Sequence, residues 1–274
     1  MLRDKTLFIT GATRGIGKAI AMRAAKEGAN IIVASKTTHP HPKLPGTIFS
    51  AAEDLINAGA KKALPLKVDI RDEEQVKKAF DEASSEFGHI DVLVNNASAI
   101  YALPTEKTPM KRYDLMMDVN VRGAYLCSRT ALPLLKKSEN PHILNLSPPL
   151  NMSPQWFGRH VAYTISKYGM SMCVLGMAEE FRQYKIAVNA LWPKTVIATA
   201  ALQALPIKIE RAQCRKDTIV ADAAYHIFCQ DSKQFTGNFL IDEQVIRTFD
   251  KSCDLSQYAY DPTAELLVDF FVDE

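Results

Sequence analysis

The stretch TLFITGATRGIGKAIAMRAAKEG, residues 6–28, joins a short apolar segment to an amphipathic one through three glycines. The part before the glycines is typical of a buried strand, and the part after them of a helix. Gly11 permits a tight turn, Gly15 lets the backbone approach a pyrophosphate, and Gly17 allows the helix to pack closely on the strand. Free amides at the start of the helix then favour phosphate charge. The spacing departs from G-x-G-x-x-G, so a bare glycine turn is the alternative, but the strand and helix around it favour a nucleotide site.

The rest of the chain repeats this alternation of short apolar and longer amphipathic segments. Besides residues 6–10, strands are expected at residues 30–35, 63–69, 90–95, 142–147, 186–192 and 238–242. Helices are expected near residues 15–28, 47–58, 72–87, 108–138, 161–184 and 218–229. Such alternation is typical of a parallel sheet with helices on both faces. Because no proline- or glycine-rich linker divides the chain, we predict one doubly wound α/β domain with a seven-stranded sheet over residues 1–249, followed by a C-terminal extension over residues 250–274.

The composition is that of an ordinary globular protein, with 47% hydrophobic and 23% charged residues. The formal net charge of +2 is too small to indicate nucleic acid or an anionic membrane as a partner. No apolar run is long enough to span a bilayer, and MLRDK at the N-terminus leaves no room for a signal peptide. The 5 cysteines form no C-x-x-C pair, and HPHP (39–42) lacks a third metal ligand. We therefore expect a soluble cytoplasmic protein without a metal.

The end of the second expected strand indicates which nucleotide binds. A unit that binds NAD normally presents an acid there to the ribose hydroxyls, whereas this chain has Ser35 and Lys36. Lys36 can pair with a 2′-phosphate, and Arg14 in the glycine turn can approach that phosphate from the other side. The sequence therefore favours NADP(H), with a solvated loop lysine as the alternative reading of Lys36.

Three motifs follow the glycine turn in order: NNAS at residues 95–98, Asn120 within MMDVNVRG, and YTISK at residues 163–167. With them the chain resembles the short-chain dehydrogenase/reductase family over nearly its whole length, up to the last expected strand. The resemblance implies a Rossmann-type domain that binds a nicotinamide cofactor and interconverts an alcohol and a carbonyl.

The resemblance also implies roles for single residues. Asp69, after the third expected strand, would hydrogen-bond the adenine amino group, and Ala97 would lie against the ribose. Asn120 would hold a helix kink and a water on the proton path. Together with the glycine turn, the expected cofactor-binding residues are Gly11, Thr13, Arg14, Gly15, Ile16, Gly17, Lys36, Asp69, Asn96, Ala97, Tyr163 and Lys167.

Tyr163 and Lys167 carry the expected proton transfer. They are four residues apart, so on a helix they share one face. A free tyrosine with a pKa near ~10 is a poor base at neutral pH, and an adjacent ammonium group stabilises its phenolate. The resemblance implies that Tyr163 exchanges a proton with the substrate oxygen, while Lys167 binds the nicotinamide ribose and lowers the pKa of Tyr163. An exposed Tyr–Lys pair without a function is the alternative.

The serine that normally follows the fifth strand of the family is displaced here. The family's strand ends N-x-S-S, and its second serine polarises the substrate oxygen. If the family's strand end is aligned on Asn145-Leu146-Ser147, Pro148 stands at the position of the second serine. If that position is instead counted back from Tyr163 at the family's usual interval, Leu150 stands there. Neither side chain can donate a hydrogen bond. The nearby replacements are Ser147, Asn151 and Ser153, and we expect Ser147 to be catalytic, with a strand-end serine bound to backbone as an equal alternative.

Two further positions depart from the family pattern. Lys194 follows Pro193 where a glycine is usual, so the turn after the sixth strand is expected to be rebuilt. DEQ (242–244) stands where Asp-Gly-Gly is common. Both lie near the expected substrate pocket. The chain then ends in the acidic and aromatic sequence LLVDFFVDE, which would dock either on its own domain or on a neighbour.

The expected protein is therefore an NADP(H)-dependent oxidoreductase for an apolar or lipid-like alcohol or carbonyl, with Tyr163 as proton donor and acceptor. Trp156 and Phe157 would cap such a substrate or simply pack. The alternative is a catalytically impaired nucleotide-binding or sensor protein, suggested by Pro148 and Lys194. Apolar residues on the long helices indicate a homodimer or homotetramer. By resemblance alone, a peroxisomal or mitochondrial location is also open.

Overall fold

The strands pair in parallel in the order β3-β2-β1-β4-β5-β6-β7 in the computed structural model, which describes residues 1–41, 44–204 and 208–273. The order reverses between β1 and β4, and ligands of such sheets bind beyond the carboxyl ends of the strands at this switch point. The predicted doubly wound seven-stranded sheet is confirmed for the described residues. The strands are β1 (Thr6–Thr10), β2 (Asn30–Ser35), β3 (Lys62–Lys67), β4 (Val92–Asn95), β5 (His142–Asn145), β6 (Ala187–Trp192) and β7 (Phe239–Ile241).

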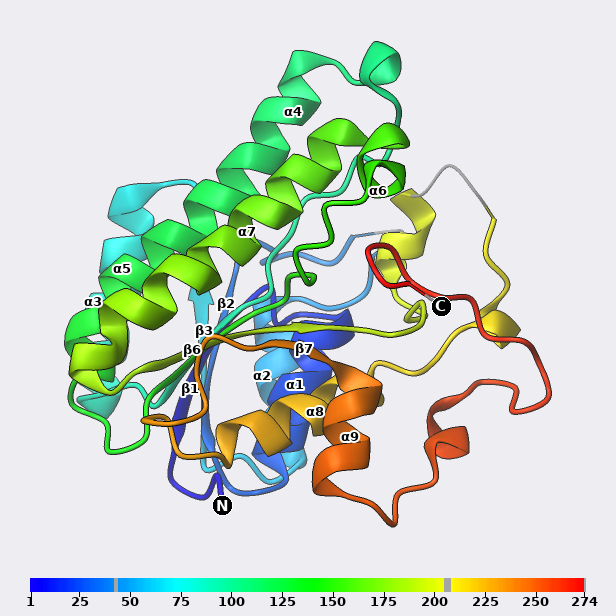
Figure 1. Ribbon diagram of the computed structural model, residues 1–274. Coiled ribbons are helices and arrows are strands. Elements are labelled where there is room, and N and C mark those ends of the chain that lie inside the picture. Colours follow the sequence, from blue (N-terminus) through cyan, green and yellow to red (C-terminus); the bar gives the residue numbers. More distant parts are fainter. Residues whose placement is uncertain (42–43, 205–207, 274) are drawn as a thin grey trace.

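Helices cover both faces of this sheet (Figure 1). One face carries α1 (Gly15–Ala25), α2 (Ile48–Asn57), α8 (Thr218–Phe228) and α9 (Asp242–Phe249). The other face carries α3 (Glu73–Phe87), α5 (Ala124–Leu135) and α7 (Val161–Glu180). Two further helices lie beyond the sheet in Figure 1: α4 (Met110–Met116), which continues the line of α5, and the short α6 (Pro154–Gly158), which precedes α7.

The central strand β1 shows why this sequence forms a two-sided sheet. Successive side chains of a strand point to opposite faces. Leu7 and Ile9 join the hydrophobic cluster under α1, α2 and α8, while Phe8 joins the cluster under α3, α5 and α7. There the ring of Phe8 stacks on Phe80, with 4.2 Å between the ring centroids. A strand that is buried on both faces is apolar throughout, and the TLFIT segment has this pattern.

The helix expected over residues 108–138 is interrupted. After α4, a π-helix runs over Met117–Gly123, and α5 begins at Ala124. Asn120 lies in the π-helix, and its side chain bonds Ala99 and Ser166 outside it. Single wide turns of this kind are frequent at functional sites. The hydrophobic period alone indicated one helix, because it cannot detect these distant hydrogen bonds. The helix kink that the resemblance implied at Asn120 lies where the π-helix is found.

The region after β7 also differs from the expectation. The strand expected to reach residue 242 ends at Ile241, and α9 follows at once. Asp242 is buried, and its carboxylate accepts a hydrogen bond from the backbone amide of Glu243. Asp242 therefore ends the strand and starts the helix. Val245 and Ile246 then pack under α8. The spacing of these apolar residues was a helix signal that the strand assignment overlooked.

The end of the C-terminal extension, residues 265–273, returns to the carboxyl ends of the strands and is called the C-terminal segment below (red in Figure 1). Val268 forms an antiparallel bridge with Thr195, in the loop after β6. Phe271 is buried, with 1% of its surface exposed. The sequence analysis left open whether this segment docks on its own domain or on a neighbour. In the structure it packs on its own chain.

Candidate active site

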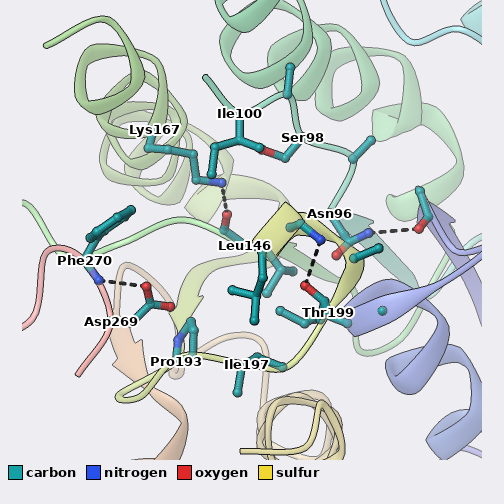
Figure 2. Close-up of a pocket in the computed structure, with 18 of the residues that line it drawn as sticks. Asn96, Ser98, Ile100, Leu146, Lys167, Pro193, Ile197, Thr199, Asp269 and Phe270 are labelled. Carbon is teal, nitrogen blue, oxygen red and sulfur yellow. Dashed lines mark hydrogen bonds between the residues drawn. The ribbon is translucent and has the colours of Figure 1, made fainter. Parts of the chain in front are cut away.

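A cavity of about 1440 Å³ lies beyond the carboxyl ends of the strands. Its wall combines the glycine turn, the ends of β2 and β4, helix α7, the loop after β6 and the C-terminal segment (Figure 2). Gly17 and the expected catalytic residues Asn120 and Ser147 are not part of the lining. The expected cofactor-binding residues that line it are Gly11, Thr13, Arg14, Gly15, Ile16, Lys36, Asp69, Asn96, Ala97, Tyr163 and Lys167.

The glycine turn leaves an open backbone cradle at one end of the cavity. Gly11 has a φ of 69°, and its amide donates to the carbonyl of Ala34 at 2.8 Å. A Cβ at Gly11 would lie 2.9 Å from Nδ2 of Asn96, and one at Gly17 only 2.3 Å from the same atom. Only glycine fits both places, at Gly11 to form the turn and at Gly17 to let α1 pack on it. The cradle therefore fits a pyrophosphate at the start of α1.

Basic side chains surround the end of β2. Arg14 lines the cavity, and its guanidinium donates to the carbonyl of Pro45 at 2.9 Å and to Oγ1 of Thr37 at 3.3 Å. The loop after β2 thereby holds Arg14 beside the exposed Lys36. Asp69 lies at the same end, but both oxygens of its carboxylate bond Arg71, which lowers the pKa of Asp69.

Asn120 acts behind the cavity wall. Its Nδ2 donates to the carbonyl of Ala99 and to Oγ of Ser166, both at 2.9 Å, and its Oδ1 accepts the amide of Ala99 at 2.8 Å. Ser166 in turn donates to the carbonyl of Tyr163 at 2.8 Å. Asn120 thus joins the loop after β4 to the turn of α7 that carries Tyr163.

Tyr163 and Lys167 line the cavity from α7 and are almost fully buried. The Nζ of Lys167 donates to the carbonyl of Leu146 at 2.6 Å (Figure 2) and lies 5.0 Å from the ring centre of Trp192. Burial lowers the pKa of Lys167 to about 7. Burial also raises the pKa of Tyr163 above its ordinary value, and the nearby Asp269 adds to this. The direction is opposite to the decrease expected from Lys167, because loss of water favours the neutral phenol.

The segment after β5 places none of its three polar candidates in the cavity lining. The hydroxyl of Ser147 is buried and finds no hydrogen-bond partner among the described residues. The side chain of Asn151 donates to Asp273 at 2.8 Å, and Ser153 is the residue before α6. The carbonyl of Pro148 accepts a hydrogen bond from the hydroxyl of Ser171 at 2.6 Å, which fixes this segment against α7.

The C-terminal segment supplies a wall that sequence reasoning missed. The ring of Phe271 lies among several aromatic side chains, with centroid distances of 5.3 Å to Tyr168, 5.9 Å to Trp192, 6.0 Å to Trp156 and 6.2 Å to Tyr163. Its φ of 70° is rare for a bulky residue and costs roughly 1–3 kcal/mol. Burying the ring contributes about 1.5–3 kcal/mol, so packing offsets the backbone cost.

The residues that depart from the family pattern hold this segment. Lys194 has no positive φ, and its backbone amide donates to the carboxylate of Asp242 at 2.8 Å. The carbonyl of Lys194 accepts the amide of Asp269 at 3.1 Å, and its Nζ donates to the carbonyl of Asp273 at 2.9 Å. Lys194 is therefore accommodated without the strained backbone that was expected of a lysine in a glycine's conformation. Asn151 holds the side chain of Asp273 from the other side.

Comparison with known families identifies the chain. A family model described as short chain dehydrogenase matches residues 5–208. The chain belongs to the short-chain dehydrogenase/reductase family. It is an oxidoreductase of this family, as the glycine cradle and the Tyr163–Lys167 pair in one cavity lead one to expect.

Curated relatives match almost the whole chain. Hydroxysteroid dehydrogenase-like protein 2 of Rattus norvegicus is 60% identical over 269 residues, which are 98% of this chain and 51% of the relative. The Homo sapiens protein of the same name is 59% identical, over 98% of this chain and 63% of its own length. The chain thus spans about half to two thirds of the length of these relatives.

Solved structures share the fold. A putative dehydrogenase from Xanthomonas campestris is 51% identical, with a TM-score of 0.97 over 100% of both chains, so the match includes the C-terminal segment. A metagenomic short-chain oxidoreductase in complex with NADP is 24% identical, with a TM-score of 0.72 over 88% of this chain and 97% of its own. A short chain dehydrogenase from Mycobacterium paratuberculosis bound to NAD is 22% identical, with a TM-score of 0.73 over the same shares.

The described residues contain neither a membrane-spanning helix nor a metal-binding cluster. No helix there is long and apolar enough to cross a membrane. No group of three or more His, Cys, Asp or Glu side chains there could hold a metal ion. Of the HPHP sequence, Pro42 lies outside the described residues.

Burial of Lys167 gives a prediction for stability. Below about pH 7 the folded chain carries the charged ammonium at its full desolvation cost. As pH rises from about 7 toward 10.5, the ordinary pKa of lysine, the folded Lys167 is already neutral while the unfolded one loses its proton, so the cost fades. Lys167→Met should therefore stabilise the nucleotide-free protein by about 1–2 kcal/mol at pH 6 and by less at pH 9. Urea unfolding at both pH values measures this, and a loss of stability at pH 6 would contradict it.

Proposed function

We propose that this chain is an NADP(H)-dependent oxidoreductase that interconverts an alcohol and a carbonyl on an apolar substrate, with Tyr163 as proton donor and acceptor. The observation that carries the proposal is one cavity that joins the glycine cradle to the buried Tyr163 and Lys167. A nucleotide lying along the carboxyl ends of the strands would extend from the cradle toward these two side chains.

The buried pair suits proton exchange in both directions. The cofactor, when bound, supplies or accepts the hydride. Because the pKa of Tyr163 is raised, its phenol keeps a proton to give to the oxygen of a carbonyl under reduction. In the reverse direction the phenolate needs a nearby positive charge. We expect Lys167 to supply it, and the bond from its Nζ to the Leu146 carbonyl supports this role by fixing the ammonium group.

The lining near Tyr163 favours an apolar substrate. Leu146, Trp156, Trp192 and Phe270 all contribute to this part of the wall, with Ile100 from the loop after β4. Apolar and aromatic walls of this kind release water when they enclose an apolar group, while a few polar groups fix the reacting atom.

The basic end of the cavity supports NADP(H) rather than NAD(H). Ser35 presents no carboxylate that would repel a 2′-phosphate, while Arg14 and Lys36 line the same end. Arg14 is held by the loop carbonyl of Pro45, so its charge is already in place. The two neighbours in complex with NADP and bound to NAD have under 25% identity to this chain, so the choice rests on its own residues.

Two broader expectations stay proposals. Tyr125 on α5 and Met172 and Leu175 on α7 each expose more than half of their surface, which supports a homodimer or homotetramer formed through these helices. The described cysteines are all free, as is usual in a reducing compartment such as the cytoplasm.

The oxidoreductase proposal is tested by turnover. A panel of aliphatic and aromatic ketones and aldehydes is incubated with NADPH, and the absorbance of the cofactor is followed. We expect reduction of apolar carbonyls by the wild type and a loss of at least about 100-fold in Tyr163→Phe, because the phenol is the proton donor. Equal NADPH affinity in both proteins serves as the control. Tight cofactor binding without turnover on any carbonyl would instead favour the nucleotide-binding or sensor protein.

The cofactor proposal is tested by Lys36→Ala. Wild type should prefer NADPH to NADH by at least about tenfold, or 1.4 kcal/mol. Lys36→Ala should weaken NADPH binding and leave NADH binding nearly unchanged, and the difference should shrink at high salt. Lys26→Ala, an exposed lysine at the end of α1 outside the cavity, is the matched control. Fluorescence titration at low salt measures the affinity of each of the three proteins for both cofactors, and equal affinity of the wild type for NADPH and NADH would refute the basic-pair argument.

A further inference from the structure

The substrate side of the cavity lacks the hydroxyl that the family places after β5. Neither Ser147 nor Ser153 lines it, and the side chain of Asn151 is bonded to Asp273. Ser98 does line the cavity, but its hydroxyl donates a hydrogen bond to the side chain of Asn120 behind the wall. Another polar group must therefore fix the reacting oxygen if the enzyme is to orient it at two points.

Asp269 is a polar side chain on this wall that the C-terminal segment brings in. Its amide donates to the carbonyl of Lys194 at 3.1 Å, and the neighbouring Val268 pairs with Thr195. One carboxylate oxygen accepts the amide of Phe270 at 2.7 Å (Figure 2), and the other has no hydrogen-bond partner among the described residues. The backbone is thus fixed on both sides, while one oxygen of the side chain stays available to the cavity.

Resting on the proposed function, we propose that Asp269 is a substrate-contacting residue, whose carboxyl group hydrogen-bonds the reacting oxygen held at Tyr163 and so acts in place of the absent serine. The lining of one cavity by Asp269, Tyr163 and Lys167 carries the proposal. The electrostatic influence of Asp269 on both α7 side chains agrees with this closeness.

The protonation of Asp269 decides which partner it can bind. Burial raises the pKa of Asp269 to about 7, and the carboxylate of Asp242 adds to this, while the ammonium of Lys167 opposes it. Below that pKa the carboxyl group donates a hydrogen bond to a carbonyl oxygen, and above it the carboxylate accepts one from an alcohol. Tyr163 faces the same space, and the Nζ of Lys194 is bonded to the carbonyl of Asp273. During reduction the proton transferred to the oxygen comes from Tyr163, and Asp269 keeps its own.

The test uses a complex that cannot react. Protein saturated with NADP⁺ is titrated with 2-octanone, an apolar ketone, and the heat of binding is measured at pH 6 and pH 8.5. NADP⁺ cannot reduce a ketone, so the titration reports contact with the carbonyl oxygen without turnover. The wild type should bind the ketone more tightly at pH 6, where Asp269 is protonated.

Two variants separate contact from architecture. At pH 6, Asp269→Ala should weaken ketone binding by about tenfold, which corresponds to the loss of one hydrogen bond. Asp269→Asn should bind at both pH values within about threefold of the affinity that the wild type has at pH 6, because its amide donates at any pH. NADP⁺ affinity should be the same in all three proteins. The matched control on the C-terminal extension is Asp261→Asn. The wild-type carboxylate of Asp261 accepts hydrogen bonds from Thr263 in its own turn.

Equal ketone affinity in the wild type and Asp269→Ala, including no measurable binding in either, would overturn the proposal. So would a wild-type affinity that does not change between the two pH values. Since this titration needs no hydride transfer, its outcome is independent of the turnover assay on Tyr163→Phe. Ketone binding that depends on Asp269 in a protein without turnover would therefore count against the proposed function alone.

Discussion

The docking of Phe271 is the interaction on which the substrate side of this enzyme depends. The residue lies far from α7 in sequence, yet its ring packs beside Tyr163, Tyr168 and Trp192. Its left-handed backbone would not persist without this burial, because strain of that kind survives only where the surroundings fix it. Once the ring is in place, Asp269 and Phe270 necessarily lie on the cavity wall.

This docking changes the electrostatics of the catalytic pair. It removes water from around Tyr163 and Lys167, so burial raises the pKa of the phenol and lowers that of the ammonium. Both shifts disfavour the charged forms. Near neutral pH only the shift of Lys167 costs stability, because Tyr163 is uncharged there in the folded and the unfolded chain alike. Sites that hold charged groups in a cavity without water commonly reduce the stability of the folded protein in this way. For Lys167, the negative charge of Asp269 opposes part of the effect of burial on the pKa.

The sequence predicted the parts of the molecule that local patterns specify. The strand–turn–helix at Gly11 depends on residues within one βαβ unit, and the four-residue spacing of Tyr163 and Lys167 fixes their common face on α7. The alternation of short apolar and longer amphipathic segments was sufficient to predict the seven-stranded sheet between two layers of helices.

The parts that depend on distant contacts could not be predicted in the same way. The π-helix depends on the bonds of Asn120 to Ala99 and Ser166, so the family resemblance, and no local pattern, indicated a kink there. The burial of Ser147 follows from the way Pro148 meets α7. Lys194, which departs from the family's glycine, was visible in the sequence as an irregularity. Its meaning became clear only with its bonds to the C-terminal segment.

The central claim is that the C-terminal segment completes the substrate site without taking part in the nucleotide cradle. The most direct measurement compares wild type and Phe271→Ala for NADPH affinity and for kcat/KM in carbonyl reduction, with circular dichroism to confirm that the sheet persists. The account predicts an NADPH affinity within about twofold and a kcat/KM at least about tenfold lower, or 1.4 kcal/mol of transition-state stabilisation. A folded Phe271→Ala protein that reduces carbonyls as efficiently as the wild type would contradict it.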